Sequence, residues 1–373
     1  MKAYTSNNIR NIAVLGHGGK GKTTLCEAML YIAGASDRLG RVADGNTVLD
    51  FDSEEKRRKS SVSSAIAALE WDNTKLNIID APGLFDFEGG AAEAVRAAEA
   101  VLIVTSAGSG VDVGTEKAFR ATEKKGAAKF FAVTKTDSDH RNFYKTFDAL
   151  KEVYGNKLCP TIIPYMEGNI TKCYVNLMTG MAFSYDENGK ATKVPVPEDS
   201  VIEEMTSAFM EAVATTDDAL MEKFFEGEKF TKEEILKGLC IGIFDGSIYP
   251  VYAVSGLTCA GVDQLLYGLA WSAPGAFGYA GEKCTYENGE EGILPCDENG
   301  PLAAVCFKTI ADPFVGKMSF FKVVSGKLAP DTAAYNFRTG EIEKMGKIVF
   351  VKGAKQEDAP AIIAGDIGAV TKI

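Results

Sequence analysis

The stretch of sequence that decides the fold spans residues 16–23 and reads Gly16-His17-Gly18-Gly19-Lys20-Gly21-Lys22-Thr23. It fits the pattern GxxxxGK(S/T) and lies between an apolar run ending at Leu15 and a helical pattern beginning at Thr23, the context that a phosphate-binding loop requires. The glycines allow backbone N–H groups to surround phosphate oxygens, and the helix start adds partial positive charge. The alternative, a glycine-rich turn that only caps a helix, is disfavoured by the exact spacing and the context. The motif predicts that Lys22 bridges the β- and γ-phosphates of a nucleotide and that the Thr23 hydroxyl ligates Mg²⁺.

A second motif, Asp80-Ala81-Pro82-Gly83, closes an apolar strand pattern over residues 75–79. In a nucleotide-binding protein, the Asp80 carboxylate would hold Mg²⁺ through water and the Gly83 N–H would sense the γ-phosphate. Such a motif alone is more often a plain turn. Its combination with residues 16–23 favours the functional interpretation.

A third motif, Thr134-Lys135-Thr136-Asp137, follows the strand pattern FFAV and is similar to the guanine signature NKxD. The Asp137 carboxylate would accept hydrogen bonds from N1–H and the N2 amine of guanine. Adenine lacks this pair of donors, so it would leave the Asp137 carboxylate without a hydrogen-bond partner. Lys135 would lie along the base, whereas Thr134 replaces the Asn that ties this loop to the phosphate loop, so a surface turn stays open as the alternative. Ser255-Gly256 would supply a backbone N–H to guanine O6.

Strand and helix patterns alternate through the first half of the chain and near residue 260. Strands are predicted at residues 9–15, 75–79, 101–105, 130–133 and 250–254, and helices at 23–33, 93–100, 115–125 and 262–271. This alternation predicts an α/β fold, a mostly parallel sheet with helices on both faces.

The alternation of strand and helix patterns ends at about Asn156. Residues 175–185 and 190–196 flank a turn at 186–189, and two acidic amphipathic helices are predicted at 200–226 and 231–239, the second with a capping box between Thr231 and Glu234. After Gly281 short strands predominate, which predicts a small β-barrel. These strands are expected at residues 303–310, 317–326, 332–337, 346–351 and 367–373.

The amino-acid composition excludes several classes of protein. The chain has 373 residues, 46% apolar and 24% charged, with a net charge of −11, so we expect two or three packed domains and no wholesale disorder. The acidic balance argues against non-specific coating of nucleic acid, although basic patches stay possible. There is neither a long apolar run nor a signal-peptide pattern. The eight cysteines never form CxxC and only two histidines accompany them, which indicates reduced thiols in the cytoplasm rather than a zinc site.

With these motifs in order, the chain resembles elongation factor G and related translational GTPases almost end to end. The matching segments are residues 77–87, 219–239, 311–328 and 362–370. Asp137 and Ser255 lie 118 positions apart, and this family carries an insert there. The resemblance implies a phosphate-loop GTP-binding domain at residues 1–155 and 251–278, an inserted α+β subdomain at 156–250, and a β-barrel second domain at 279–373.

The resemblance also implies the ligands and partners. We expect GTP or GDP with Mg²⁺, and a protein that docks on ribosomal RNA and proteins, with no membrane or DNA partner, as a monomer. The nucleotide would contact residues 16–23, Thr24, Thr134, Lys135, Asp137, Ser255 and Gly256.

The first switch region of the family falls at residues 50–62. Ser61 occupies the position of a family Thr that contacts Mg²⁺, and it retains the hydroxyl. Residues 56–59 (Lys-Arg-Arg-Lys) would face ribosomal RNA phosphates when this segment is ordered. A solvated, mobile charged loop is the alternative.

Two departures from the family carry sharper hypotheses. Leu84 stands where the family has the His that positions the attacking water, and a leucine cannot orient water by hydrogen bonding. Lys22 and Gly83 keep their identities, so we expect intact GTP binding with slow hydrolysis. Gly19 and Lys20 replace an Asp and a small residue, so Lys20 either substitutes in part for a monovalent cation or points to solvent.

Alternative functions stay open at this point. The chain could use GTP or GDP as a conformational ligand with little turnover, or be a ribosome-protection paralogue. An unrelated phosphate-loop ATPase is disfavoured by Asp137 and by the barrel match. Because the family continues through further domains, we expect 373 residues to be part of a longer protein.

Overall fold

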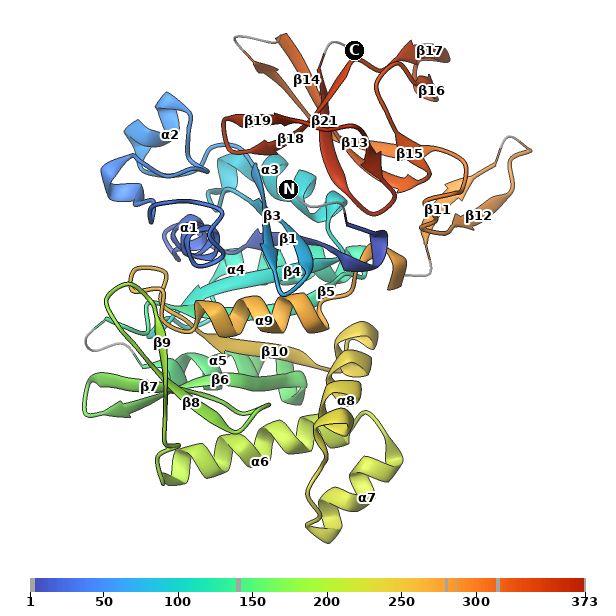
Figure 1. Ribbon diagram of the computed structural model, residues 1–373. Coiled ribbons are helices and arrows are strands. Elements are labelled where there is room, and N and C mark those ends of the chain that lie inside the picture. Colours follow the sequence, from blue (N-terminus) through green and yellow to red (C-terminus); the bar gives the residue numbers. More distant parts are fainter. Residues whose placement is uncertain (1–3, 139–141, 279–280, 287, 313–315, 372–373) are drawn as a thin grey trace.

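The computed structural model describes residues 4–138, 142–278, 281–286, 288–312 and 316–371 (Figure 1). Its central element is a ten-stranded sheet of order β2-β3-β1-β4-β5-β10-β6-β7-β8-β9. The strands are β1 (Ile9–Leu15), β2 (Ala65–Trp71), β3 (Thr74–Asp80), β4 (Ala100–Ser106), β5 (Ala128–Thr134), β6 (Leu158–Glu167), β7 (Ile170–Asn176), β8 (Met181–Tyr185), β9 (Ala191–Val194) and β10 (Tyr249–Ala253). The strands from β3 to β6 in this order pair in parallel, and antiparallel strands flank them at both ends.

Helices cover both faces of this sheet. They are α1 (Lys22–Ile32), α3 (Glu88–Ala97), α4 (Val113–Lys125), α5 (Phe143–Tyr154) and α9 (Val262–Ser272). α1 and α9 pack against each other and against β3, while α3 and α4 pack against each other and against β1 and β4. The predicted α/β class is therefore confirmed. Within the described residues, no helix has both the length and the apolar composition that a membrane crossing needs.

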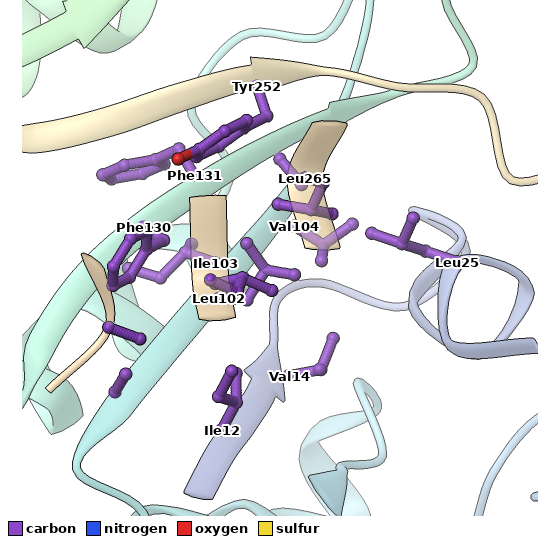
Figure 2. Close-up of a cluster of buried hydrophobic side chains, with 14 of the residues drawn as sticks. Ile12, Val14, Leu25, Leu102, Ile103, Val104, Phe130, Phe131, Tyr252 and Leu265 are labelled. Carbon is purple, nitrogen blue, oxygen red and sulfur yellow. The ribbon is translucent and has the colours of Figure 1, made fainter. Parts of the chain in front are cut away.

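The core lies at the centre of the sheet, where strands buried on both faces carry continuous apolar runs. Figure 2 shows Ile12 and Val14 of β1 beside Leu102, Ile103 and Val104 of β4. All five side chains are fully buried. Since β1 leads into residues 16–21 and α1, this rigid centre fixes the position of the phosphate loop.

Residues 156–250 contain β6–β9, which continue the same sheet, and the helices α6 (Ser200–Ala214), α7 (Asp218–Glu226) and α8 (Lys232–Asp245). The predicted single helix at 200–226 is wrong, because Asp217 caps a new helix by accepting from the Ala219 N–H. The predicted strand at 175–185 is likewise wrong, since a turn at 177–180 separates β7 from β8. The capping box between Thr231 and Glu234 is confirmed.

The C-terminal part is an antiparallel β domain, which lies at the top of Figure 1. Its main sheet has the order β13-β14-β21-β18-β19, and three two-stranded ribbons accompany it. The strands of the main sheet are β13 (Ala303–Asp312), β14 (Gly316–Ser325), β18 (Lys347–Lys352), β19 (Lys355–Asp358) and β21 (Ile367–Thr371). The ribbons are β11 (Glu282–Thr285) with β12 (Glu291–Leu294), β15 (Lys327–Leu328) with β20 (Ile362–Ile363), and β16 (Ala333–Asn336) with β17 (Glu341–Lys344). The predicted strand at 367–373 is confirmed up to Thr371, and its last two residues lie outside the described ranges.

Polar side chains connect this β domain to the ten-stranded sheet. Lys308 Nζ of β13 donates to Ser64 Oγ at 2.9 Å and to Glu93 Oε2 at 3.1 Å. Ser64 follows the first switch segment and Glu93 lies on α3, and the Ser64 hydroxyl donates to Glu93 at 2.7 Å. The two parts of the chain therefore meet directly behind the switch segment.

Candidate guanine-nucleotide site

The loop between β1 and α1 has a backbone that only glycine adopts easily. Gly16 and Gly21 have φ values of 140° and 88°, in the region that favours glycine. A Cβ on Gly16 would lie 2.2 Å from the carbonyl oxygen of Val104. The close approach of the loop to β4 therefore requires glycine there.

Lys22 lies at the centre of this loop. Its Nζ donates to the carbonyl oxygens of Gly16 and His17, each at 3.0 Å, and the side chain is buried. Burial lowers the pKa of Lys22, and the negative charge of Asp80 acts in the opposite direction. A Cβ on Gly83 would lie 2.2 Å from Lys22 Nζ, so the structure brings the predicted pair Lys22 and Gly83 into contact.

Four oxygen-bearing side chains meet at the first turn of α1. Thr23 Oγ1 lies 3.0 Å from Ser61 Oγ, and the Ser61 hydroxyl donates to Asp50 Oδ1 at 2.7 Å. Both carboxylate oxygens of Asp80 and Oδ2 of Asp50 are buried without a hydrogen-bond partner among the described residues. Hard oxygen ligands of this kind fit Mg²⁺, which takes one or two carboxylates and completes its shell with phosphate and water. The predicted set Thr23, Ser61 and Asp80 is thus brought together.

The electrostatics of this cluster agree with a cation site. Burial, followed by the charge of Asp50, raises the pKa of Asp80 to about 7, against the opposing influence of the Thr23 hydroxyl and Lys22. Burial also raises the pKa of Asp50. A divalent cation would lower both pKa values, because it stabilises the ionised carboxylates.

Buried glutamates hold the switch segment in place. Glu55 accepts from the backbone N–H groups of Val62 and Ser63, at 3.1 and 3.3 Å. Glu27 of α1 accepts in the same way from Val48 and Leu49, at 2.8 and 3.0 Å. These bonds fix both ends of the segment that carries Asp50 and Ser61.

The basic residues of this segment lie on a short helix, α2 (Ser53–Arg58). Arg57 and Arg58 both pair with Glu54, and this lowers the pKa of that carboxyl to about 2. The segment thus forms a capped helix with its own ion pairs.

The second loop of the site is tied to the phosphate loop. The Thr134 hydroxyl lies 2.6 Å from Lys20 O and 3.0 Å from Thr105 O, and Lys135 Nζ donates to Gly19 O at 2.8 Å. Lys135 adopts a φ of 60°, and its side chain lies against the phosphate loop. Thr134 therefore makes the link between loops that its replacement of Asn put in question.

The third loop completes the site beside α1. A Cβ on Gly256 would lie 3.0 Å from the backbone of Thr24 and Leu25, so residues 255–256 pack directly on the helix start. Ser255 is buried, and its hydroxyl accepts from the Thr258 N–H at 3.1 Å. Asp137 is exposed and lies three residues beyond the end of β5. All three predicted nucleotide-contacting segments thus border one region.

Leu84 and Lys20 have defined positions in the structure. Leu84 is 41% exposed, and its Cδ2 lies 3.0 Å from where a Cβ on Gly18 would be. Lys20 does not point to solvent: its Nζ lies 3.0 Å from Asp112 Oδ2 and donates to Ser109 Oγ at 2.9 Å. Asp112 therefore compensates the charge that Lys20 adds to the loop.

Sequence reasoning missed several residues of this region. Asp50 and Glu55 are buried carboxylates in a polar stretch, whereas Glu27 lies in the apolar helix α1, and only their contacts with the switch segment identify what they do. The sequence around Asp112 does indicate its role, because an Asp that lies shortly after β4 and directly before a helical pattern is typical of an N-cap. It accepts from the Thr115 N–H at 3.0 Å.

A parallel sheet whose first strand leads through a glycine-rich loop into a helix, with a TKTD loop beside it, defines a guanine-nucleotide-binding protein of the phosphate-loop class. Residues 7–274 match the family described as the elongation factor Tu GTP binding domain, and residues 301–373 match elongation factor G domain 2. The chain therefore belongs to the elongation factor GTP-binding family.

Individual relatives agree with this assignment. Two proteins named Elongation factor G-like protein, from two strains of Mycobacterium tuberculosis, are each 32% identical over 385 residues, covering 98% of this chain and 53% of the relative. A crystal structure of a protein from Thermus thermophilus is 30% identical, with a TM-score of 0.85, over 98% of this chain and 52% of that one. The chain thus spans about half the length of these relatives.

Proposed function

We propose that the chain is the nucleotide-binding part of a GTP-switched translation factor that acts on the ribosome in the cytoplasm, in keeping with its similarity to the elongation factor G-like proteins. The observation that carries the proposal is the meeting of three loops at the start of α1. Residues 16–24 would surround the phosphates, residues 134–137 would contact the base, and residues 255–256 would complete its pocket.

Guanine recognition rests on Asp137. Its carboxylate would accept from N1–H and the N2 amine of guanine, with Lys135 along the base and the backbone of Ser255 and Gly256 near O6. An adenine base offers no such pair of donors, so the Asp137 carboxylate beneath it would be left without hydrogen-bond partners.

Thr23, Ser61 and Asp80 would hold Mg²⁺, with Asp50 as a further acidic neighbour. The cation would neutralise charge on the β- and γ-phosphate oxygens. The chain's own contribution is to place these oxygens together: Ser61 lies 3.0 Å from Thr23, and hydrogen bonds to Glu55 and Glu27 support the segment that carries it.

Hydrolysis would be slow in this chain. Lys22 and the Gly83 N–H would stabilise charge on the γ-phosphate, but Leu84 cannot accept a proton or align water. A second candidate function follows from the same side chain, namely a binding protein that uses GTP and GDP as conformational ligands with little turnover. A ribosome-protection role is a third possibility within the family.

Helix α2 would form part of the surface that binds the ribosome. Its residues Arg57 and Arg58 have side chains that are 70% and 46% exposed. Release of their pairing with Glu54 would allow contact with RNA phosphates. Such binding would weaken as salt concentration rises.

Titration of fluorescent GDP, GTP, ADP and ATP tests the proposal, repeated with Asp137→Asn. Guanine nucleotides should bind far more tightly than adenine nucleotides to the unaltered chain, and the variant should lose that preference. Asp148→Asn, an exposed position on α5, is the matched control. Equal affinity of the unaltered chain for GDP and ADP would contradict guanine recognition.

A further inference from the structure

Strand β7, in the predicted inserted subdomain, contacts residues 134–137, called the guanine loop below, at two points. Thr136 Oγ1 lies 2.7 Å from the hydroxyl oxygen of Tyr174, and the Thr171 hydroxyl donates to the carbonyl oxygen of Thr136 at 2.9 Å. Thr136 and Tyr174 are both buried. Since Thr136 directly precedes Asp137, a contact that fixes Thr136 also restrains the carboxylate proposed to read the base.

The loop has a conformation that needs such restraint. Lys135 adopts a φ of 60°, which side-chain-bearing residues rarely adopt. Thr134 and Lys135 anchor one side of the loop to the phosphate loop. Tyr174 and Thr171 anchor the other side to the inserted strands, so the loop is held between two separate parts of the chain.

Asp137 follows directly after Thr136, the residue that Tyr174 contacts. Burial raises the pKa of Tyr174 above its usual range, and the negative charge of Asp137 raises it further. The phenol therefore stays neutral and acts only as a hydrogen-bonding group beside Asp137.

The same tyrosine and its neighbours contact the third loop of the site. A Cβ on Gly261 would lie 3.5 Å from Cδ1 of Tyr174, and the carbonyl of Ala260 accepts from the Ser255 N–H at 2.9 Å. In the turn between β8 and β9, a Cβ on Gly189 would lie 2.4 Å from the Cβ of Cys259. The inserted strands thus pack against both loops that would surround the base.

We infer that Tyr174 is a positioning residue for guanine recognition: through Thr136 it orients Asp137, and its ring packs against the turn that follows Ser255. The inference rests on the proposed function, because it assigns the inserted strands a role in reading the base. It predicts that removal of one oxygen atom from β7 changes base selectivity without removing any group that touches the nucleotide.

The test compares GDP with IDP, whose base lacks the N2 amine and so makes one fewer hydrogen bond to Asp137. Tyr174→Phe should weaken GDP binding about tenfold, as expected for a lost buried hydrogen bond, and IDP binding by less. The ratio of the two affinities should therefore fall. Tyr144→Phe is the matched control, because it removes a hydroxyl that donates to Pro164 O at 2.6 Å and not to residues 134–137.

Thr136→Val provides an independent variant and closes a double-mutant cycle. If the two hydroxyls act as a pair, the double variant should be no weaker than either single variant. Unchanged GDP affinity, or equal losses for GDP and IDP with a lower melting temperature, would overturn the inference while leaving guanine binding itself intact. Absence of any guanine preference in the unaltered chain would instead overturn the proposed function.

Discussion

Lys75 of β3 and Asp366, 291 positions apart in the chain, form an ion pair between the nucleotide-binding sheet and the β domain. Lys75 Nζ lies 2.7 Å from Asp366 Oδ2, and the two side chains are 2% and 5% exposed. Asn77 also donates to Asp366 at 2.9 Å, and to Asn11 at 2.8 Å. A buried pair of this kind holds two parts in one orientation, because separating them would leave two charges without partners.

Asp366→Asn should lower the free energy of unfolding by about 3–5 kcal/mol, because it leaves the Lys75 ammonium buried without an anion. Denaturant titration of the 373-residue chain measures this. Asp331→Asn is the control, since its pair with Lys344 is exposed and should contribute almost nothing. Equal effects of the two substitutions would show that the buried pair does not join the two parts.

Leu84→His should raise the rate of single-turnover GTP hydrolysis by about 10²-fold or more, because an imidazole can align the attacking water. GTP affinity should change little, since Lys22 and Thr23 are untouched. Val153→His, an exposed site on α5, adds the same side chain elsewhere. If the unaltered chain already hydrolyses GTP rapidly on ribosomes, the hypothesis of slow turnover fails.

Thr134→Val should weaken GDP binding about tenfold, because it removes the hydroxyl that links the guanine loop to Lys20 O. Thr134→Asn should retain binding, since an amide can donate to the same carbonyl. Thr122→Val is the matched control: that buried hydroxyl donates to Ala118 O at 2.7 Å within α4. Full affinity in Thr134→Val would mean that Lys135 alone holds the two loops together.

GTP affinity should be the same in KCl and NaCl, because Lys20 already brings a positive charge to the phosphate loop. Its pairing with Asp112 holds Lys20 beside the loop, so Lys20→Ala should weaken GTP binding in both salts. A strong preference for K⁺ in the unaltered chain would exclude the hypothesis that Lys20 replaces a cation.

Local sequence patterns predicted the central sheet well, because its strands are apolar on both faces. The predicted strand at residues 9–15 coincides with β1, and the loop at 16–23 lies where its motif required. The β2 strand and α2 were missed, since one is rich in alanine and the other is stabilised by Asp52 and Glu55.

Contacts between segments far apart in the sequence could not be predicted from local sequence patterns. Thr136 and Tyr174 are separated by 38 positions, and Lys308 and Ser64 by 244. Each of these side chains is an ordinary polar residue until folding places its partner beside it. The positions of the motif segments in the fold could thus be predicted, whereas the residues that hold these segments in place could not.

The β domain also covers the open edge of the large sheet. β18 packs against β2, the last strand on that side, and the Gly353 N–H donates to Ile66 O at 3.0 Å. Without this cover, the apolar strand Ala65–Trp71 would present unpaired backbone groups, which invite pairing with the same strand of another molecule. A shortened chain ending near residue 274 would therefore tend to self-associate through β2, and biochemical work on the nucleotide site is better done with the β domain attached.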